Sequence, residues 1–229
     1  SIHNLPVLRA EIDKLDTQIQ DLITKRAGIA QQVAQAKRAE EKNPNFYRPE
    51  REAKILRDVI ARNQGPLSNE MLTQIFREIM SACLALQRPI TIAFLGPAGT
   101  SSQAAVYKHF GHASQGMPVQ TIDEVFREVE AGTADYGVVP VENSTEGGVN
   151  QTLNSFMKTP LKICGEIELS IHHLLLSQMS ELHQIKRIYA HQQSFAQCRS
   201  WLDNQLPPIE RIPGNGNATA ARRLAGEPG

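Results

Sequence analysis

The sequence predicts an α plus α/β fold, with an all-helical domain over residues 1–88 and an α/β domain over residues 90–229. Apolar residues recur three and four positions apart as far as Leu86, which is the spacing of amphipathic helices. At Pro89 this spacing gives way to short apolar runs that alternate with helical patterns, as in an open, mostly parallel sheet. The 229 residues suffice for two domains of ordinary size.

The first predicted helix, Leu5 to Arg38, is long and carries cations on its apolar side. Arg26 occupies the one gap in the apolar stripe, where an arginine needs an anionic partner. Arg9 and Lys37 lie at the edge of the same stripe, so three cations share its side of the helix. The stripe consists of Leu5, Leu8, Ile12, Leu15, Ile19, Leu22, Ile29, Val33 and Ala36. The pattern predicts a helix packed lengthwise on other helices.

The spacing of these cations indicates which of them can share a ligand. At a rise of about 1.5 Å per residue, Arg26 and Lys37 lie about 16 Å apart on nearly the same side, so both can lean onto one small molecule. Arg9 lies about 25 Å from Arg26 and about 40 Å from Lys37 and cannot reach that molecule. If Arg9 binds the same kind of anion, it does so in another subunit's site, as a two-fold dimer would arrange. The simpler alternative is that Arg26 pairs with a carboxylate of a neighbouring helix.

Two shorter helices are predicted next, one over Glu50 to about Arg62 and one that Ser68 caps and Pro89 closes. They are too short to cover the first helix, so a second copy of the chain is expected over its exposed half. Polar residues beside the apolar stripes of the three helices form a set: Arg26, Lys37, Arg51, Glu52 and Gln87. One such residue is usually a satisfied core group, but five together indicate a buried pocket for a small dianion.

Composition excludes several classes of partner. The formal net charge is zero, so no global field favours nucleic acid or an anionic membrane. Three scattered cysteines fit reduced thiols, and no apolar run approaches the length of a membrane span. We therefore expect a soluble cytoplasmic protein without a leader segment.

The elements expected after Pro89 alternate between strands and helices. A buried strand over Ile90 to Leu95 leads through Gly96-Pro97-Ala98-Gly99-Thr100 into a helix. Thr121 and Glu124 form a capping-box pattern at the start of another helix. The expected strands are residues 90–95, a strand near Val119, 135–141, a long region over 161–176, and 186–190; the expected helices are residues 101–110, 121–131, 149–157, 194–204 and 217–225.

The helical half resembles the all-helical chorismate mutase family. The resemblance rests on Leu8-Arg9 through Ala36-Lys37, on Tyr47-Arg48-Pro49-Glu50-Arg51-Glu52, and on Ser81 to Gln87. It implies an intertwined homodimer through the N-terminal helix, with two equivalent sites for chorismate.

The resemblance also implies roles for the site residues. Arg26 and a partner chain's Arg9 would hold the substrate carboxylates, and Lys37 and Gln87 would donate to the ether oxygen. Glu52 would bind the ring hydroxyl, and Arg51 would line the site. Arg48 stands where some members have an aspartate, and Cys83 where some have a serine. The rearrangement to prephenate needs no nucleophile, metal or cofactor.

Two stretches of the α/β half have the composition of ligand sites. The glycine-rich turn over Gly96 to Thr100 precedes a helix whose backbone N–H groups can bind an anion, although most such turns are merely tight turns. Glu142-Asn143-Ser144-Thr145 leaves a strand end, where open α/β sheets bind ligands; a polar cap is the alternative. His172 and His173 have no cysteine or carboxylate at ligand spacing, so metal is not expected.

Together these stretches resemble the prephenate dehydratase family. The matching runs are Gly96 to Thr100, Thr121 to Phe126, Gly137 to Ser144 and His191 to Cys198, and the order of the halves is similar to bifunctional enzymes of phenylalanine synthesis. The resemblance implies two α/β lobes, like periplasmic binding proteins, with the site in their cleft. Prephenate would face Glu142, Asn143 and Gln197, with Thr100 and Ser144 as weaker candidates.

Some family features are missing from the sequence. The family's Thr-Arg-Phe segment, a late segment returning to the first lobe and the phenylalanine-sensing domain are absent, while Ser101 and Ala190 replace an aromatic and a polar residue. We therefore expect a truncated chain with an active mutase and an inactive dehydratase. The alternative is a non-catalytic module that binds an aromatic acid and carries a helical dimerisation arm.

Overall fold

The computed structural model describes residues 4–42, 44–144 and 147–226, which form two compact units. One unit runs up to Thr91 and also takes in Tyr107–Gln115; the other holds Ile92–Val106 and the residues from Gly116 on. The predicted helices are confirmed as α1 (Leu5–Glu40), α2 (Pro49–Arg62) and α3 (Asn69–Gln87). Ser68 caps α3 as predicted, because its hydroxyl accepts from the Met71 amide at 3.2 Å.

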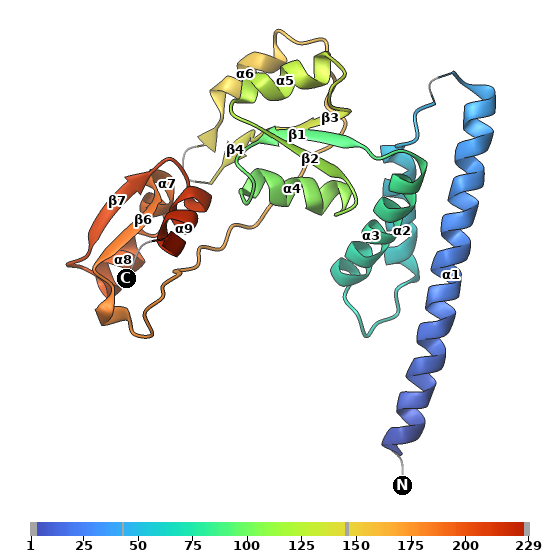
Figure 1. The fold of residues 1–229 in the computed structure, drawn as a ribbon, viewed down its shortest axis with the longest axis horizontal. Coiled ribbons are helices and arrows are strands. Elements are labelled where there is room, and N and C mark those ends of the chain that lie inside the picture. Colours follow the sequence, from blue (N-terminus) through green and yellow to red (C-terminus); the bar gives the residue numbers. More distant parts are fainter. Residues whose placement is uncertain (1–3, 43, 145–146, 227–229) are drawn as a thin grey trace. The chain divides into compact units, whose positions relative to one another are not determined.

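In the helical unit, α1 lies lengthwise beside α2 and α3, and its N-terminal part extends beyond both (Figure 1). The face that α1 turns inward differs from the predicted one. Ala34 is buried, and Arg26, Ala30 and Lys37 on the same face are half-buried. The small side chains of Ala30 and Ala34 let α1 approach α3 closely. The eight large residues of the predicted stripe are 42–67% exposed, so the chain's own α2 and α3 do not cover this stripe.

The segment Tyr107–Gln115 is part of the helical unit, because it contacts α3. Arg77 on α3 donates to the His109 carbonyl at 2.8 Å, and the Glu78 carboxylate lies 2.7 Å from the His112 ring. Gly111 has φ of +76°, and a Cβ placed there would lie 2.4 Å from the Ser81 Cβ. Only glycine therefore permits this close approach to α3.

The second unit contains a sheet of three strands, β1 (Thr91–Leu95), β2 (Gln115–Val119) and β3 (Tyr136–Val138), in the order β2-β1-β3; only the first residues of β1 and β2 belong to the helical unit. β1 and β3 pair in parallel, as predicted. In Figure 1, α4 (Ser101–Phe110) lies on one face of this sheet, and α5 (Ile122–Glu130) and α6 (Asn150–Phe156) lie on the other. The Thr121 hydroxyl accepts from the Glu124 amide at 3.2 Å, which confirms the predicted N-cap.

The remaining elements include a small hairpin and a second parallel pair. β4 (Glu142–Asn143) pairs antiparallel with β5 (Gly147–Gly148), and β6 (Arg187–His191) pairs in parallel with β7 (Glu210–Gly214). The helical elements here are the 3₁₀ turn η1 (Leu182–Gln184), α7 (Gln192–Gln197), α8 (Arg199–Gln205) and α9 (Asn217–Gly226).

Three predictions for this half are wrong. The expected strand over residues 161–176 is irregular, because no strand of the described chain pairs with it. The helix expected over 194–204 is broken at Cys198, and the strand expected over 135–141 is limited to Tyr136–Val138. The strand β7 has no counterpart among the strands that the sequence predicts. No helix of the described residues is long and apolar enough to cross a membrane.

Candidate functional site

The helical unit gathers most of the predicted mutase residues on or beside its buried side. Arg26, Lys37, Glu52 and Gln87 are half-buried and come from all three helices, whereas Arg48 and Arg51 at the start of α2 are exposed. Cys83 is buried in α3. The chain therefore concentrates charged and amide side chains where burial strengthens electrostatic interactions.

Glu52 is the carboxylate of this cluster and lies in a positive field. Burial raises its pKa to about 6, and the neighbouring charges of Arg77 and Arg26 partly oppose that rise. Arg26 is thus close enough to Glu52 for the two charges to interact. In the simpler alternative, in which Arg26 pairs with a carboxylate of a neighbouring helix, Glu52 on α2 is that carboxylate.

Lys37 lies near the end of α1, beside the loop that leads to α2. Its ammonium donates to the Asn45 carbonyl at 3.0 Å and lies 5.7 Å from the centroid of the Phe46 ring. Burial lowers the pKa of Lys37, and the charge of Arg48 lowers it further. The charge of Glu41 partly opposes this shift, and that of Arg51 adds to it. Lys37 therefore shares one region with Arg48 and Arg51 at the start of α2.

The structure does not bring Arg9 to this cluster. Arg9 is exposed on the N-terminal part of α1, and the unbroken helix between it and Arg26 corresponds to about 25 Å. A ligand of this cluster cannot reach Arg9 of the same chain.

The glycine-rich turn after β1 already uses two of its backbone N–H groups. Gly96 donates to the Val119 carbonyl at 2.7 Å, and Gly99 donates to the Gln103 side chain at 2.7 Å. The Thr100 hydroxyl donates to the Leu95 carbonyl at 3.3 Å. These two amides therefore already donate to residues of β2 and α4, so an anion bound at this turn would have to use other amides of the loop.

Glu142, Asn143 and Ser144 lie on the small hairpin. Glu142 and Asn143 form β4 and pair with Gly148 and Gly147, while Ser144 follows in the turn. Glu142 and Ser144 are exposed and Asn143 is half-buried. The hairpin is joined to α6 through the Val149 amide, which donates to the Val141 carbonyl at 2.7 Å. Thr145 of the predicted motif lies outside the described residues.

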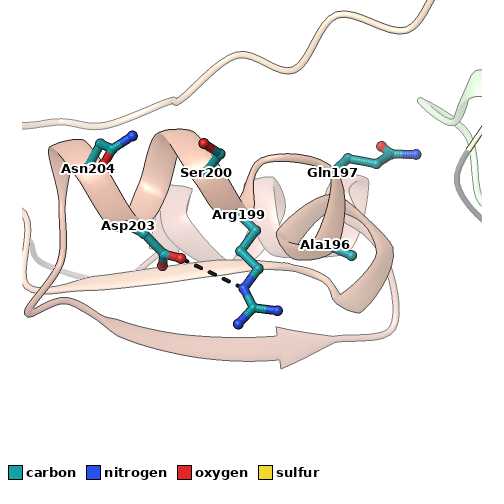
Figure 2. A pocket seen from close by; sticks show the side chains of 6 residues that line it. All are labelled: Ala196, Gln197, Arg199, Ser200, Asp203 and Asn204. Carbon is teal, nitrogen blue, oxygen red and sulfur yellow. Dashed lines mark ion pairs between the residues drawn. The ribbon is translucent and has the colours of Figure 1, made fainter.

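Gln197 ends α7 and borders an open surface pocket of about 490 Å³ (Figure 2). Its side-chain oxygen lies 2.5 Å from the His173 ring nitrogen. Arg199 and Asp203 pair at 3.7 Å along α8, and Figure 2 shows the Gln197 side chain extending away from that pair. The other residues lining the pocket are Ala196, Ser200 and Asn204.

Four residues that sequence analysis missed contact the predicted sites. Arg77 interacts with Glu52, and the Arg38 guanidinium donates to the Gln87 carbonyl at 2.5 Å. Phe46 contacts Lys37, and Arg222 on α9 donates to the Ala98 carbonyl at 3.1 Å. The contacts of Arg38 and Arg222 end on backbone carbonyls, which every residue has, so no residue pattern could have pointed to them. The described residues contain no group of three or more potential ligands arranged for a metal ion.

Comparison with known proteins identifies both halves. The family model "Prephenate dehydratase" matches residues 92–228, and the model "Chorismate mutase type II" matches residues 8–88. Bifunctional chorismate mutase/prephenate dehydratases of Stutzerimonas stutzeri and Pseudomonas aeruginosa are 54% and 53% identical to this chain over 227 residues. In each case the alignment covers 97% of this chain and 62% of the relative, so the chain spans about three fifths of their length.

A solved structure is also similar. The prephenate dehydratase from Arthrobacter aurescens in complex with L-Phe is 34% identical, covering 60% of this chain and 46% of that chain with a TM-score of 0.49. Because the prephenate dehydratase model matches more than half of the sequence, the chain belongs to the prephenate dehydratase family, with a chorismate mutase type II segment preceding that domain.

Proposed function

We propose that the helical domain, residues 1–88, converts chorismate to prephenate, and that the α/β domain, residues 90–229, carries a binding site for prephenate. The observation that carries the first part is the half-buried set of Arg26, Lys37 and Glu52, which a helical dimerisation arm alone would not need. The match of the chorismate mutase model to residues 8–88 supports the same assignment.

The proposed chemistry is a unimolecular shift within chorismate. The site holds the substrate in its compact conformer and stabilises the negative charge that grows on the ether oxygen. The Lys37 ammonium and the Gln87 amide donate to that oxygen, each worth about 2.7–4 kcal/mol by analogy with oxyanion holes. Arg26 binds a substrate carboxylate through its planar fork, and Glu52 accepts from the ring hydroxyl. Arg51, Arg48 and Cys83 line the pocket.

The proposed assembly is an intertwined homodimer built on α1. Each site takes Arg26 from one chain and the partner subunit's Arg9, which the 25 Å separation along one helix requires. The exposed apolar stripe supports this arrangement, because eight large apolar side chains on one helix form the kind of surface that a second copy covers.

The proposed dehydratase site lies in the α/β domain, in a cleft between two lobes as in periplasmic binding proteins. Glu142, Asn143 and Gln197 contact prephenate there, and Thr100 and Ser144 lie at its edge. The location of Glu142 and Asn143 beyond the end of a parallel strand supports the assignment, because open α/β sheets bind ligands at such positions.

The first experiment is to incubate the purified chain with chorismate and to divide the product between acid-treated and untreated aliquots. Acid converts prephenate to phenylpyruvate without enzyme. Phenylpyruvate after acid alone supports the mutase and the expected inactive dehydratase. Phenylpyruvate in the untreated aliquot also supports the mutase, but contradicts the expectation of an inactive dehydratase. Unchanged chorismate contradicts the mutase proposal and favours the non-catalytic binding module.

A substitution separates catalysis from assembly. Lys37→Ala is expected to abolish turnover while the sedimentation coefficient of the chain stays that of the wild type. Lys25→Ala, at an exposed position on the same helix, is the matched control and is expected to retain activity. Full turnover by Lys37→Ala would contradict the proposal that this lysine donates to the ether oxygen.

A further inference from the structure

The two donors proposed for the ether oxygen come from different helices. Lys37 lies in the last turn of α1, and Gln87 is the last residue of α3. Two hydrogen bonds to one oxygen require that the donors keep a fixed separation, because a displacement of about 1 Å can reduce a rate about 100-fold. Some contact must therefore hold the end of α1 against the end of α3.

Arg38 provides that contact. Its guanidinium donates to the Gln87 carbonyl at 2.5 Å, which joins the last turn of α1 to the last residue of α3. The same guanidinium carbon lies 5.1 Å from the centroid of the Phe46 ring. The Lys37 ammonium lies 5.7 Å from the centroid of that ring. The Phe46 ring thus contacts both Lys37 and Arg38, and Arg38 in turn bonds the backbone of Gln87, whose side-chain amide is the second donor.

The loop that carries Phe46 is itself well anchored. The Tyr47 amide donates to the Asn45 side chain at 3.1 Å, and the Tyr47 side chain is buried against Phe110, with ring centroids 5.5 Å apart. Lys37 donates to the Asn45 carbonyl, and an ammonium has three N–H donors, so this bond leaves others for a ligand. Phe46 is half-buried and so is partly shielded from water, which strengthens ring–cation contacts.

We propose that Phe46 is a positioning residue for the mutase reaction, whose ring holds Lys37 and Arg38 side by side and thereby fixes the separation of the donors Lys37 and Gln87. This inference rests on the proposed mutase function. Phe46 does not contact the reacting atoms; it acts through the two cations that flank it.

The test compares Phe46→Leu with Phe46→Tyr in the full chain, using chorismate as substrate. Leucine keeps an apolar side chain without a π face, and we expect kcat to fall about 5- to 30-fold, the range for loss of a partly desolvated cation–π contact. KM is expected to change less than kcat, because the interaction is needed in the transition state. Tyrosine keeps the ring face and is expected to restore kcat to within about twofold of wild type.

The second arm tests the route through Arg38. Arg38→Gln should lower kcat by a similar factor. The kcat of the Phe46→Leu/Arg38→Gln double variant should be little lower than that of either single variant, because both substitutions disrupt the same connection between α1 and α3. Phe76→Leu, which removes a half-buried ring of α3 outside this cluster, is the matched control. Arg38→Gln also keeps the inference testable if Phe46→Leu does not fold.

Three outcomes would overturn the inference: wild-type kcat in Phe46→Leu, equal losses in the leucine and tyrosine variants, or losses that multiply in the double variant. A wild-type chain without mutase turnover would instead contradict the proposed function, so the two failures are distinguishable.

Discussion

The raised pKa of Glu52 makes the stability of the helical unit depend on pH in an unusual direction. The pKa rises from 4.5 to about 6, a difference of about 1.5. At 1.36 kcal/mol per unit, ionised Glu52 destabilises the folded state by up to about 2 kcal/mol. The folded state binds the proton more tightly than the unfolded state, so stability falls as pH rises from 4.5 through 6. Above pH 6 the full penalty is present, and below 4.5 it disappears.

Glu52→Gln removes this titration and is the perturbation to measure. The free energy of unfolding of the helical unit can be followed by urea and circular dichroism at about pH 4.5 and about pH 7.5, at one protein concentration. The free energy of unfolding of Glu52→Gln minus that of the wild type should be larger at the higher pH than at the lower pH, by up to about 2 kcal/mol. Effects of the substitution that do not depend on pH cancel in this difference.

Glu50→Gln is the matched control, because it removes one carboxylate at an exposed position of the same helix. A difference between Glu52→Gln and wild type that stays constant with pH, or that grows toward acid, would refute the argument that burial dominates over the charges of Arg26 and Arg77.

Three further predictions follow from features of the helical unit. Gly111→Ala should destabilise the fold by at least about 1 kcal/mol more than Gly132→Ala in urea unfolding, because both have φ of +76° but only Gly111 meets a neighbouring side chain; equal losses would contradict the close contact. Arg77→Ala should move the pH midpoint of the Glu52 titration above about 6, measured by carboxyl NMR, and an unchanged midpoint would show that the two charges do not interact. Because Gln87 is an amide that needs no proton, chorismate turnover should persist above neutral pH, and a collapse between about pH 6 and 8 would contradict this role.

The helical half was largely predictable because its signals are local. The apolar spacing, Pro49 and the Ser68 cap each specify a helix start or face without reference to the rest of the chain. The inward face of α1 was not predictable in the same way. Arg26, Ala30 and Lys37 pack within the chain, while the more apolar stripe stays exposed, and sequence alone cannot say which partner covers which face.

In the α/β half, prediction failed where structure depends on distant pairing. Residues 161–176 alternate like a strand, but a strand forms only where another strand supplies hydrogen bonds. Arg48, Cys83 and Gln197 came from the resemblance to known families, whereas Arg26, Lys37, Arg51, Glu52 and Gln87 were found as charged and amide side chains beside apolar stripes. Arg38 and Phe46 could not be found in this way, because a carbonyl contact and a ring face leave no periodic signal.

The contacts of residues 107–115 have a consequence for how the mutase segment can be separated from the rest of the protein. The change of pattern at Pro89 suggests a place to cut the gene, yet a fragment ending there would lose Phe110, Gly111 and His112. Tyr47 would then lose its contact with the Phe110 ring, and Ser81 would lose the close approach of Gly111. The Glu78 carboxylate would lose its contact with the His112 ring. A fragment that is to keep these contacts must therefore include residues 107–115, so the boundary of the helical unit lies well beyond the change of pattern at Pro89.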